Sequence, residues 1–349
     1  MEKKLFLLDA YALIYRAHFA FINNPRINSK GLNTSAIFGF CNSLLEVINN
    51  HEPTHLGVVF DPPGGSNREE IFTEYKANRQ EMPEDIRKAI PYIFEILKAM
   101  NIQVEMVSGF EADDLIGTLS KQAEKKGYKV FMMTPDKDFG QLVSENIFIY
   151  KPGRSGNPSE ILGPKEVCEK FEVERPEQVI DILGLWGDAV DNIPGIPGIG
   201  EKTAKKLIGI YGSLENLLEN TEDLKGKQKE NLENFADQGL ISKKLATIIL
   251  DCPVEFNEAI YKRKKIDEKP LTDILKELEF NQLGKRILGK PIYQEKQMDL
   301  FASSENEPES TTNLQDFNSI KADYKLIQTK EQHLNFIKEL SSKDVVAFD

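Results

Sequence analysis

The sequence is poor in the residues that build disulfides, zinc sites and covalent catalytic centres. Its 349 residues include three widely spaced cysteines, Cys41, Cys168 and Cys252, and no CxxC pair. This odd, dispersed set predicts free thiols in a reducing compartment. Only four histidines are present, and no Ser/His/Asp or Cys/His arrangement stands out. We therefore expect neither a zinc centre nor a covalent nucleophile.

Long apolar runs are also missing. No stretch of 18 apolar residues occurs, so no membrane span is expected. The N-terminus carries two lysines but only a very short apolar segment before Asp9, which is too short for a signal peptide. We expect a cytoplasmic, nucleoid-associated protein with no membrane partner.

Positive charge is in short supply as well. Lys plus Arg number 44 against 56 Asp plus Glu, which gives a formal net charge of −12 and a pI near 5.1. Taken alone, this balance argues against nucleic acid, because phosphate neutralisation needs Lys and Arg. Bulk charge, however, does not say where on the chain the charges lie.

What the sequence does contain is a clear alternation of elements in its first 150 residues. Short apolar, β-rich runs alternate with segments of helical periodicity. The expected strands are 5–8, 57–60, 128–133 and 147–150, and the expected helices are 36–49, 84–100 and 111–126. This order predicts an α/β fold with a parallel-rich sheet flanked by helices. A mostly helical region follows, with a helix starting near Glu201.

The composition divides the chain into four parts. We expect an α/β domain over residues 1–175, with an arch at about 66–100, and a helical subdomain over 176–292. An acidic, Ser/Thr-rich linker covers 293–319. Residues 320–349 begin a further strand–helix–strand pattern, which suggests a fragment of a longer protein.

Acidic residues follow the predicted strands and cluster in three short motifs, EADD, DKD and GDAVDN. A single Asp after a strand is most often a turn former, and EADD alone is equally compatible with a solvated helix turn. In a parallel sheet, however, the carboxyl ends of the strands meet at one edge, where ligands bind. The candidate catalytic acids are Asp9, Asp61, Glu111, Asp113, Asp114, Asp136, Asp138, Asp188 and Asp191.

So many carboxylates at one edge repel one another unless cations neutralise them. Oxygen ligands without histidine or cysteine favour Mg²⁺ or Mn²⁺. Two such ions about 4 Å apart are the arrangement that hydrolyses phosphodiesters. The sequence therefore predicts two divalent cations and a nuclease.

Two further segments are suited to phosphate binding. Residues 193–206, IPGIPGIGEKTAKK, place glycines directly before a helix, where backbone N–H groups can hold DNA phosphates without reading bases. The candidate contacts here are Gly195, Gly198, Gly200, Lys202, Thr203, Lys205 and Lys206. Residues 67–85 form a basic stretch in which Arg68, Lys76 and Arg79 grip phosphate and Tyr75 stacks on a displaced base. Taken alone, this stretch is equally compatible with a solvated helix face.

Several motifs in order resemble the 5′-nuclease domains of the flap-endonuclease family that occur in bacterial DNA polymerases I. They are LLDAYALIYR, VVFDPPG, EYKANR, GFEADDLIGTL, TPDKDFGQLV and GDAVDNIPGIPGIGEKTA, within about residues 3–290. The resemblance implies a PIN-like fold with a helix-hairpin-helix subdomain. It also implies cleavage of 5′ flaps, nicked DNA and RNA primers by a monomer.

The resemblance also implies roles for individual residues. First-metal ligands would be Asp9, Asp61, Glu111 and Asp113, and second-metal ligands would be Asp136, Asp138 and Asp191. Asp114 and Asp188 would act in the outer shell. Lys76 and Arg79 would assist catalysis, and Arg16 would contact phosphate. K⁺ would bind beside the hairpin. Two departures, Ser66-Asn67-Arg68-Glu69-Glu70 in place of an SFRHE-like segment and Val190 in place of Ser, leave every ligand in place.

Three expectations concern partners. Gln297, Leu300 and Phe301 resemble a sliding-clamp motif, and Leu300 and Phe301 packing back on the nuclease is the alternative. The remaining polymerase I domains are expected in cis, since residues 320–349 resemble the start of a 3′–5′ exonuclease-like domain. A catalytically idle DNA-junction binder, a clamp-tethered module and a related metal-dependent ribonuclease are the alternative functions.

These assignments change the meaning of the acidic net charge. The nine candidate acids carry nine of the negative charges, and residues 295–316 carry a further net −5. The rest of the chain then has a net charge of +2. A DNA-binding surface is therefore compatible with the composition.

Overall fold

The computed structural model describes residues 2–153, 158–293, 327 and 329–342. The chain forms two compact units, Met1–Glu295 and Lys296–Asp349. In the second unit the described element is α15 (Lys330–Leu340). Its first turn is capped by the Thr329 hydroxyl, which accepts a hydrogen bond from the backbone N–H of Gln332 at 3.2 Å. The fold described next is that of the first unit.

A six-stranded sheet organises the first unit, with the strand order β3-β2-β1-β4-β5-β6. All neighbouring strands pair in parallel except β6, which runs antiparallel to β5. The strands are β1 (Lys4–Asp9), β2 (His55–Val59), β3 (Gln103–Glu105), β4 (Lys129–Met133), β5 (Ile147–Lys151) and β6 (Glu160–Leu162). The predicted parallel-rich α/β fold is confirmed. The three-residue strands β3 and β6 were not predicted, because so short a segment carries no periodicity.

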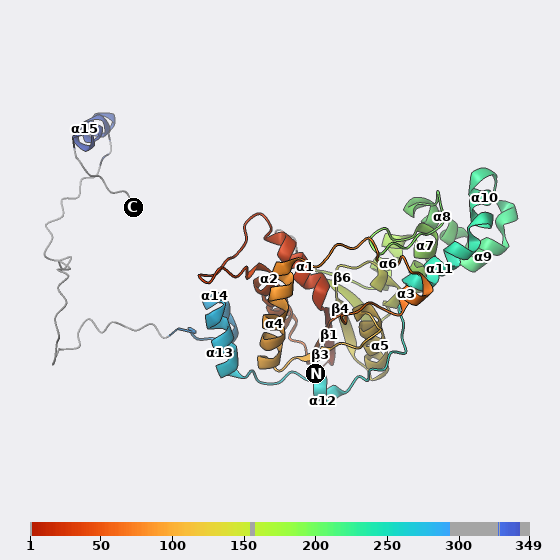
Figure 1. Cartoon of the computed structure of the whole chain (residues 1–349), viewed down its shortest axis with the longest axis horizontal. Helices are drawn as coiled ribbons and strands as arrows, with labels where there is room; N and C mark the ends of the chain where they lie inside the picture. The colour runs from red at the N-terminus through yellow and green to blue at the C-terminus, as the bar shows by residue number, and fades with distance from the viewer. Residues whose placement is uncertain (1, 154–157, 294–326, 328, 343–349) are drawn as a thin grey trace. The chain divides into compact units, whose positions relative to one another are not determined.

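Helices cover both faces of this sheet (Figure 1). Alternate residues of β1 face opposite sides, so Leu5 and Leu7 pack toward α5 while Phe6 and Leu8 pack toward α1, α2 and α4. The helices on the second side also include two from the end of the unit. The bounds are α1 (Ala10–Ala20), α2 (Ser35–His51), α4 (Glu84–Ala99), α5 (Ala112–Lys125), α13 (Glu268–Glu277) and α14 (Asn281–Leu288).

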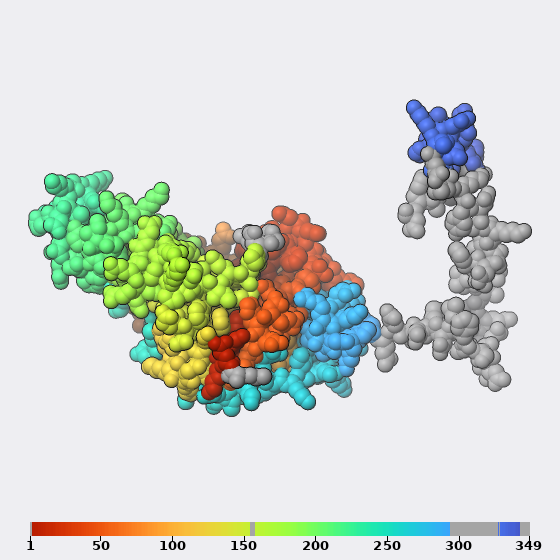
Figure 2. Space-filling view, turned by 180° about the vertical axis from the view of Figure 1, so that it is seen from behind, coloured from red at the N-terminus to blue at the C-terminus, as the bar shows by residue number. Residues whose placement is uncertain are grey.

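Six further helices extend the α5 side of the core into a lobe, which is green in Figure 2. They are α6 (Pro164–Phe171), α7 (Val179–Trp186), α8 (Glu201–Tyr211), α9 (Leu214–Glu219), α10 (Gly226–Asn234) and α11 (Ala236–Ala246). The short helix α12 (Glu258–Tyr261) lies apart from this lobe and contacts β2 (Figure 1). Short 3₁₀ helices lie at Asp138–Leu142, Pro176–Gln178 and Thr221–Asp223. The helix predicted to start near Glu201 is α8. Among the described helices, none combines the length and apolarity needed to cross a membrane.

The segment predicted as an arch, residues 66–100, is not one helix. It consists of α3 (Arg68–Ile71), a series of turns, and α4. Ile86 and Ile93 of α4 are fully buried against the sheet. Lys76 lies in these turns with φ of 58°, which is not a helical conformation. Lys76 and Arg79 therefore do not lie on one face of a helix.

Candidate active site

The carboxyl edge of the sheet brings together acids from β1, β2 and α5. Asp9 ends β1 and caps α1, accepting a hydrogen bond from the Ala12 N–H at 3.2 Å and another from the Thr134 hydroxyl at 3.0 Å. Asp61, two residues beyond β2, accepts a hydrogen bond from the Ala112 N–H at 2.9 Å. The first turn of α5 is therefore held directly against the end of β2.

Burial gives these carboxylates perturbed acidities. Burial, followed by the nearby Asp61 carboxylate, raises the pKa of Asp9 to about 7. Burial also raises the pKa of Asp61. Burial and the adjacent Asp114 carboxylate raise the pKa of Asp113 well above its ordinary value. Ionising all of these groups together is costly without cations, which is the electrostatic condition expected of a metal-binding edge.

Acids from β4 and from the loop after α7 complete the cluster. The Asp138 N–H donates to Asp136 at 3.0 Å, and both residues follow β4. Burial and Asp136 raise the pKa of Asp138 to about 7. Oδ1 of Asp138 is buried and has no hydrogen-bond partner among the described residues, although the Lys137 ammonium lies 3.3 Å away. Lys137 also pairs with Asp188.

We use the name acid cluster for the carboxylates of this edge other than Asp114. Its members are Asp9, Asp61, Glu111, Asp113, Asp136, Asp138, Asp188 and Asp191. Residues of the turns before α4 contact several of them. The Arg79 guanidinium donates to Asp191 at 2.5 Å, and the Lys76 ammonium pairs with Glu111 and lies 3.7 Å from Asp191. Burial opposes ionisation of Glu111, but Lys76 and Arg68 outweigh it and lower the pKa of Glu111.

Backbone contacts fix the same turns against the loop after α7. The Lys76 N–H donates to the Asp191 carbonyl at 2.9 Å. The side chain of Asn78 donates to the Ala189 carbonyl at 2.7 Å, and that of Asn192 donates to the Glu74 carbonyl at 2.6 Å. These two asparagines and Lys137 were missed in the sequence. The one sequence feature that could have identified Lys137 is the DKD motif, in which this lysine stands between two acids.

The acid cluster has the donor chemistry for divalent cations but is closed by basic side chains. Among the residues that the structure describes, no three acidic, histidine or cysteine side chains are grouped closely enough to hold an ion. Lys76, Arg79 and Lys137 instead supply the positive charge. The carboxylate donors and the unpartnered Oδ1 of Asp138 fit hard cations, provided that these basic side chains move aside.

Asp114 differs from its neighbours because its oxygens are already used. Both of them accept hydrogen bonds from the Arg68 guanidinium at 2.7 Å. They also accept from the N–H groups of Ile249 and Glu111, at 2.8 and 3.2 Å. Arg68 in turn donates to the Leu245 carbonyl at 2.9 Å. This pair joins α3, α5 and the end of α11.

The predictions that Arg68 and Tyr75 contact DNA are wrong. Arg68 is 3% exposed, and its guanidinium is used by Asp114 and by backbone carbonyls. Tyr75 is 5% exposed and donates its hydroxyl proton to Glu111 at 3.2 Å, so its ring is not accessible to a base. Both residues face the protein interior rather than solvent.

The prediction for Gly195 needs the same correction. Its N–H donates to the Ser242 hydroxyl at 3.0 Å, and its carbonyl accepts from Gln238 at 2.7 Å. Its φ is 60°, and a Cβ there would lie 2.5 Å from the Gly187 nitrogen. Gly195 therefore closes the hairpin from inside and has no N–H left for phosphate.

The exposed part of the hairpin consists of Gly198, Gly200 and the start of α8. Of the side chains predicted to bind DNA there, Lys202 and Lys206 are exposed and Thr203 is partly buried. Lys205 pairs with Glu201 at 2.7 Å. In α1, Arg16 donates to the Pro152 carbonyl at 3.1 Å and to that of Gly153.

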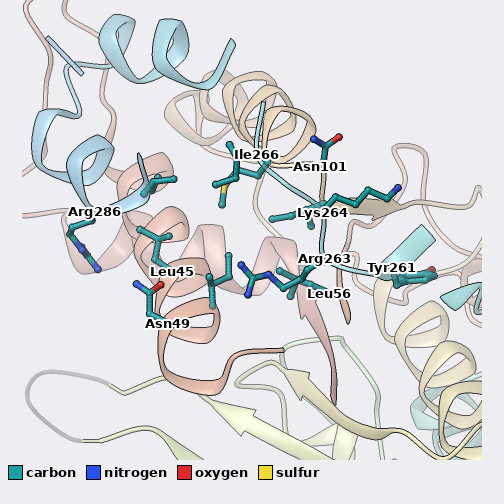
Figure 3. A pocket seen from close by; sticks show the side chains of 13 residues that line it. Leu45, Asn49, Leu56, Asn101, Tyr261, Arg263, Lys264, Ile266 and Arg286 are labelled. Atoms are coloured by element: carbon teal, nitrogen blue, oxygen red, sulfur yellow. The ribbon is translucent and has the colours of Figure 1, made fainter. Parts of the chain in front are cut away.

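A separate pocket of about 190 Å³ lies at the other end of the sheet (Figure 3). Leu56, near the start of β2, and Leu45 of α2 line its apolar part, while Arg263, Lys264 and Arg286 lie around it. None of the predicted site residues lines this pocket. It is smaller than usual ligand pockets, and the candidate site is the acid cluster.

An α/β sheet with carboxylates at its carboxyl edge and a glycine-rich hairpin beside them are the features of a class of nucleases. Comparison with known proteins identifies the family. The model of the 5′-3′ exonuclease N-terminal resolvase-like domain matches residues 4–172, and that of the C-terminal SAM fold matches residues 174–269. The chain belongs to the 5′-3′ exonuclease and flap endonuclease family.

Named relatives cover most of this chain. A 5′-3′ exonuclease of Aquifex aeolicus is 39% identical over 303 residues, which are 86% of this chain and 100% of that protein. DNA polymerase I of Bacillus subtilis is 41% identical over 288 residues, which are 82% of this chain and 32% of that protein. The chain thus spans about a third of the length of that polymerase.

Solved structures show the same fold at lower identity. T5 5′-exonuclease with bound zinc ions has a TM-score of 0.60 at 21% identity, covering 80% of this chain and 99% of that one. Bacteriophage T5 D15 flap endonuclease in a complex with DNA and metal ions has a TM-score of 0.60 at 22% identity, covering 79% and 100%.

Proposed function

We propose that this chain is a Mg²⁺-dependent 5′-3′ exodeoxyribonuclease and 5′-flap endonuclease, acting on DNA and RNA primers as the N-terminal part of a DNA polymerase I. The observation that carries this proposal is the acid cluster at the carboxyl edge of the sheet, whose donors are all carboxylate oxygens. Its support from relatives is the named 5′-3′ exonuclease that matches over its full length.

The resemblance to the family assigns seven members of the acid cluster to two sets. Residues that would hold the first Mg²⁺ are Asp9, Asp61, Glu111 and Asp113, and those for the second are Asp136, Asp138 and Asp191. When bound, two such ions supply hydroxide from water and stabilise charge on the attacking and leaving oxygens. Asp114 and Asp188 would hold no ion directly and would act on the other acids through Arg68 and Lys137 respectively.

Lys76 and Arg79 are the groups that bind the scissile phosphate. In the structure their charges pair with Glu111 and Asp191. A phosphate entering this edge would offer both side chains a new anionic partner and would leave Glu111 and Asp191 free to hold cations. The backbone of the turns that carry these residues is anchored on the loop after α7, so both side chains stay beside the acids when they change partners.

The hairpin binds the duplex beside this edge. Backbone N–H groups at Gly198, at Gly200 and in the first turn of α8 point to phosphate oxygens, and Lys202, Thr203 and Lys206 add side-chain contacts. Such contacts position DNA without reading its sequence. K⁺ bound at the hairpin adds a further positive charge next to the backbone.

Two partner assignments complete the proposal. The chain works as a monomer joined in cis to the remaining polymerase I domains. Gln297, Leu300 and Phe301, which lie outside the described residues, bind the sliding clamp. A peptide spanning 294–304 should bind the clamp at micromolar concentration, and no binding at high micromolar concentration would refute this assignment.

Cleavage of a labelled 5′-flap duplex by the full chain tests the nuclease proposal. We expect cleavage with Mg²⁺ and none in excess EDTA. Asp113→Ala should abolish cleavage while retaining DNA binding, because it removes one of the carboxylates that would hold the first Mg²⁺. Lys165→Ala, an exposed residue on α6, is the control and should cleave as wild type. Wild-type cleavage by Asp113→Ala, or cleavage in EDTA, would refute the proposal.

A further inference from the structure

Three lysines from separate elements meet beside the active-site edge. Lys151 ends β5, Lys170 is in the last turn of α6, and Lys205 is in α8. β5 pairs in parallel with β4, with Tyr150 opposite Met133, so Lys151 emerges at the edge where Asp136 follows β4. α6 lies between β6 and α8 (Figure 1).

Packing holds the three side chains together. The Lys205 ammonium donates to the backbone carbonyl of Lys170 at 2.9 Å, and this side chain is only 12% exposed. The ammonium groups of Lys170 and Lys205 lie 5.7 and 5.8 Å from the centroid of the Phe171 ring. Lys151, opposite Glu160 of β6 in the strand register, lies on the strand pair that α6 packs against, and its charge acts on Lys170. Three positive side chains thus share one small area.

Of these three lysines, only Lys205 forms an ion pair with a carboxylate of the described residues. Glu201 pairs with Lys205 at 2.7 Å. Glu160, opposite Lys151 in the β5–β6 register, attracts Lys170. Within the described part of the chain, however, no carboxylate oxygen lies within 4 Å of the Lys151 or Lys170 ammonium. Burial, and then the neighbouring Lys151, lowers the pKa of Lys170 to about 8. An anion placed between the two would relieve this repulsion.

The neighbouring elements indicate which anion this is. α8 begins at the hairpin that is proposed to bind duplex DNA, and Arg16 reaches the carbonyls of Pro152 and Gly153, directly after Lys151. Lys205 thus lies on the helix that follows the hairpin, Lys151 lies at the strand edge that carries the acids, and Lys170 contacts Lys205 between these elements. A duplex bound at both the hairpin and the acid cluster would bring its backbone phosphates near these side chains.

We propose that Lys151 and Lys170 form a binding site for backbone phosphates of the duplex arm, between the hairpin and the acid cluster. Lys205 is a positioning residue, because its ammonium is already used by Glu201 and by the backbone of Lys170. This inference rests on the proposed nuclease function and extends its DNA-binding surface to α6.

Salt-dependent binding by the full chain is the test. Removing one lysine–phosphate interaction lowers the slope of log affinity against log salt by about 0.9 on duplex DNA. We expect Lys151→Ala/Lys170→Ala to bind a 5′-flap duplex about 5–30-fold more weakly between 50 and 200 mM KCl, with a slope reduced by about 1–2. Lys165→Ala, on the same helix, should match wild type. Circular dichroism melting verifies that each variant is folded.

Substrate and pH define the site further. Single-stranded oligonucleotide binding should change less than duplex binding, and an equal loss on both would overturn the assignment to the duplex arm. Because Lys170 is charged below pH 8, wild-type affinity should fall from pH 7 to pH 9, and Lys170→Arg should remove that fall. A double variant with wild-type affinity and slope would overturn the inference. Absence of cleavage by the wild-type chain would instead refute the nuclease proposal.

Discussion

The Arg68–Asp114 ion pair is the residue-scale link between the acid cluster and the helical lobe. Its side chains are 4% and 1% exposed, and Asp114 lies next to Asp113 in α5. A buried pair of this kind adds little stability by itself, but removing one partner leaves an uncompensated charge. The pair therefore fixes the register of α3 on α5 beside the cluster.

We expect Arg68→Ala to lower the free energy of unfolding by about 3–5 kcal/mol, because Asp114 is then buried without its partner. Urea denaturation of the metal-free chain measures this. Arg68→Met combined with Asp114→Leu should recover most of the loss, since neither charge remains. Lys88→Ala, which breaks the exposed pair with Glu84, should leave the stability nearly unchanged. Equal small effects of Arg68→Ala and Lys88→Ala would contradict this prediction.

Some site residues were placed correctly from the sequence and others were not. The two groups differ in whether local or distant contacts fix their position. Asp9, Asp61 and Asp136 follow strands, and parallel pairing brings strand ends together whatever the loops do. Arg68 is decided by contacts with carbonyls 177 and 179 residues away, at Leu245 and Thr247. The sequence of residues 67–79 contains nothing that predicts contacts with such distant carbonyls. A buried arginine in this segment therefore cannot be told from a DNA-binding arginine by sequence alone.

At the scale of elements, the hairpin before α8 illustrates a second limit of prediction. The glycines of 193–206 indicated a close backbone approach, and the structure contains one. At Gly195, however, the approaching backbone belongs to Gly187 and Trp186, at the end of α7. Glycine permits close approach by any group, so the sequence alone does not distinguish a ligand from another part of the same chain.

Gly195→Ala should therefore destabilise the fold rather than merely weaken DNA binding. The left-handed conformation alone costs a non-glycine residue about 1 kcal/mol or more, and the added Cβ meets backbone. Gly209→Ala, in α8, is the matched substitution. Its added Cβ would meet only the Glu172 carbonyl oxygen at 3.8 Å, an ordinary contact, so it should raise stability by about 0.5–1 kcal/mol. Denaturation curves of both variants measure these changes in stability. An unchanged midpoint for Gly195→Ala would contradict the prediction and show that the hairpin backbone can shift to accommodate the added Cβ.

On the scale of the whole molecule, opposite charges are distributed in neighbouring sets. The acid cluster is met by Lys76, Arg79 and Lys137, while the exposed start of α8 and the Lys151–Lys170 pair stay basic. A chain of net charge −12 can therefore offer DNA a positive surface. Substrate and cations compete for the same charged groups, which couples DNA binding to metal binding.

The first unit should fold and cleave without the second. The last buried residue of its described core is Ile292, which packs against Gly284 of α14. In the second unit, α15 has no buried residue. A chain ending at residue 293 should unfold within about 2 °C of the full chain, because all the buried core residues of the described chain precede residue 293. It should also cleave a 5′-flap duplex at the full-length rate, since every member of the acid cluster and the hairpin precedes residue 207. A fall in the unfolding temperature of about 5 °C or more, or loss of cleavage, would mean that residues 294–349 are needed for the nuclease. Lys165→Ala, measured in the same two assays, is the control for a neutral change.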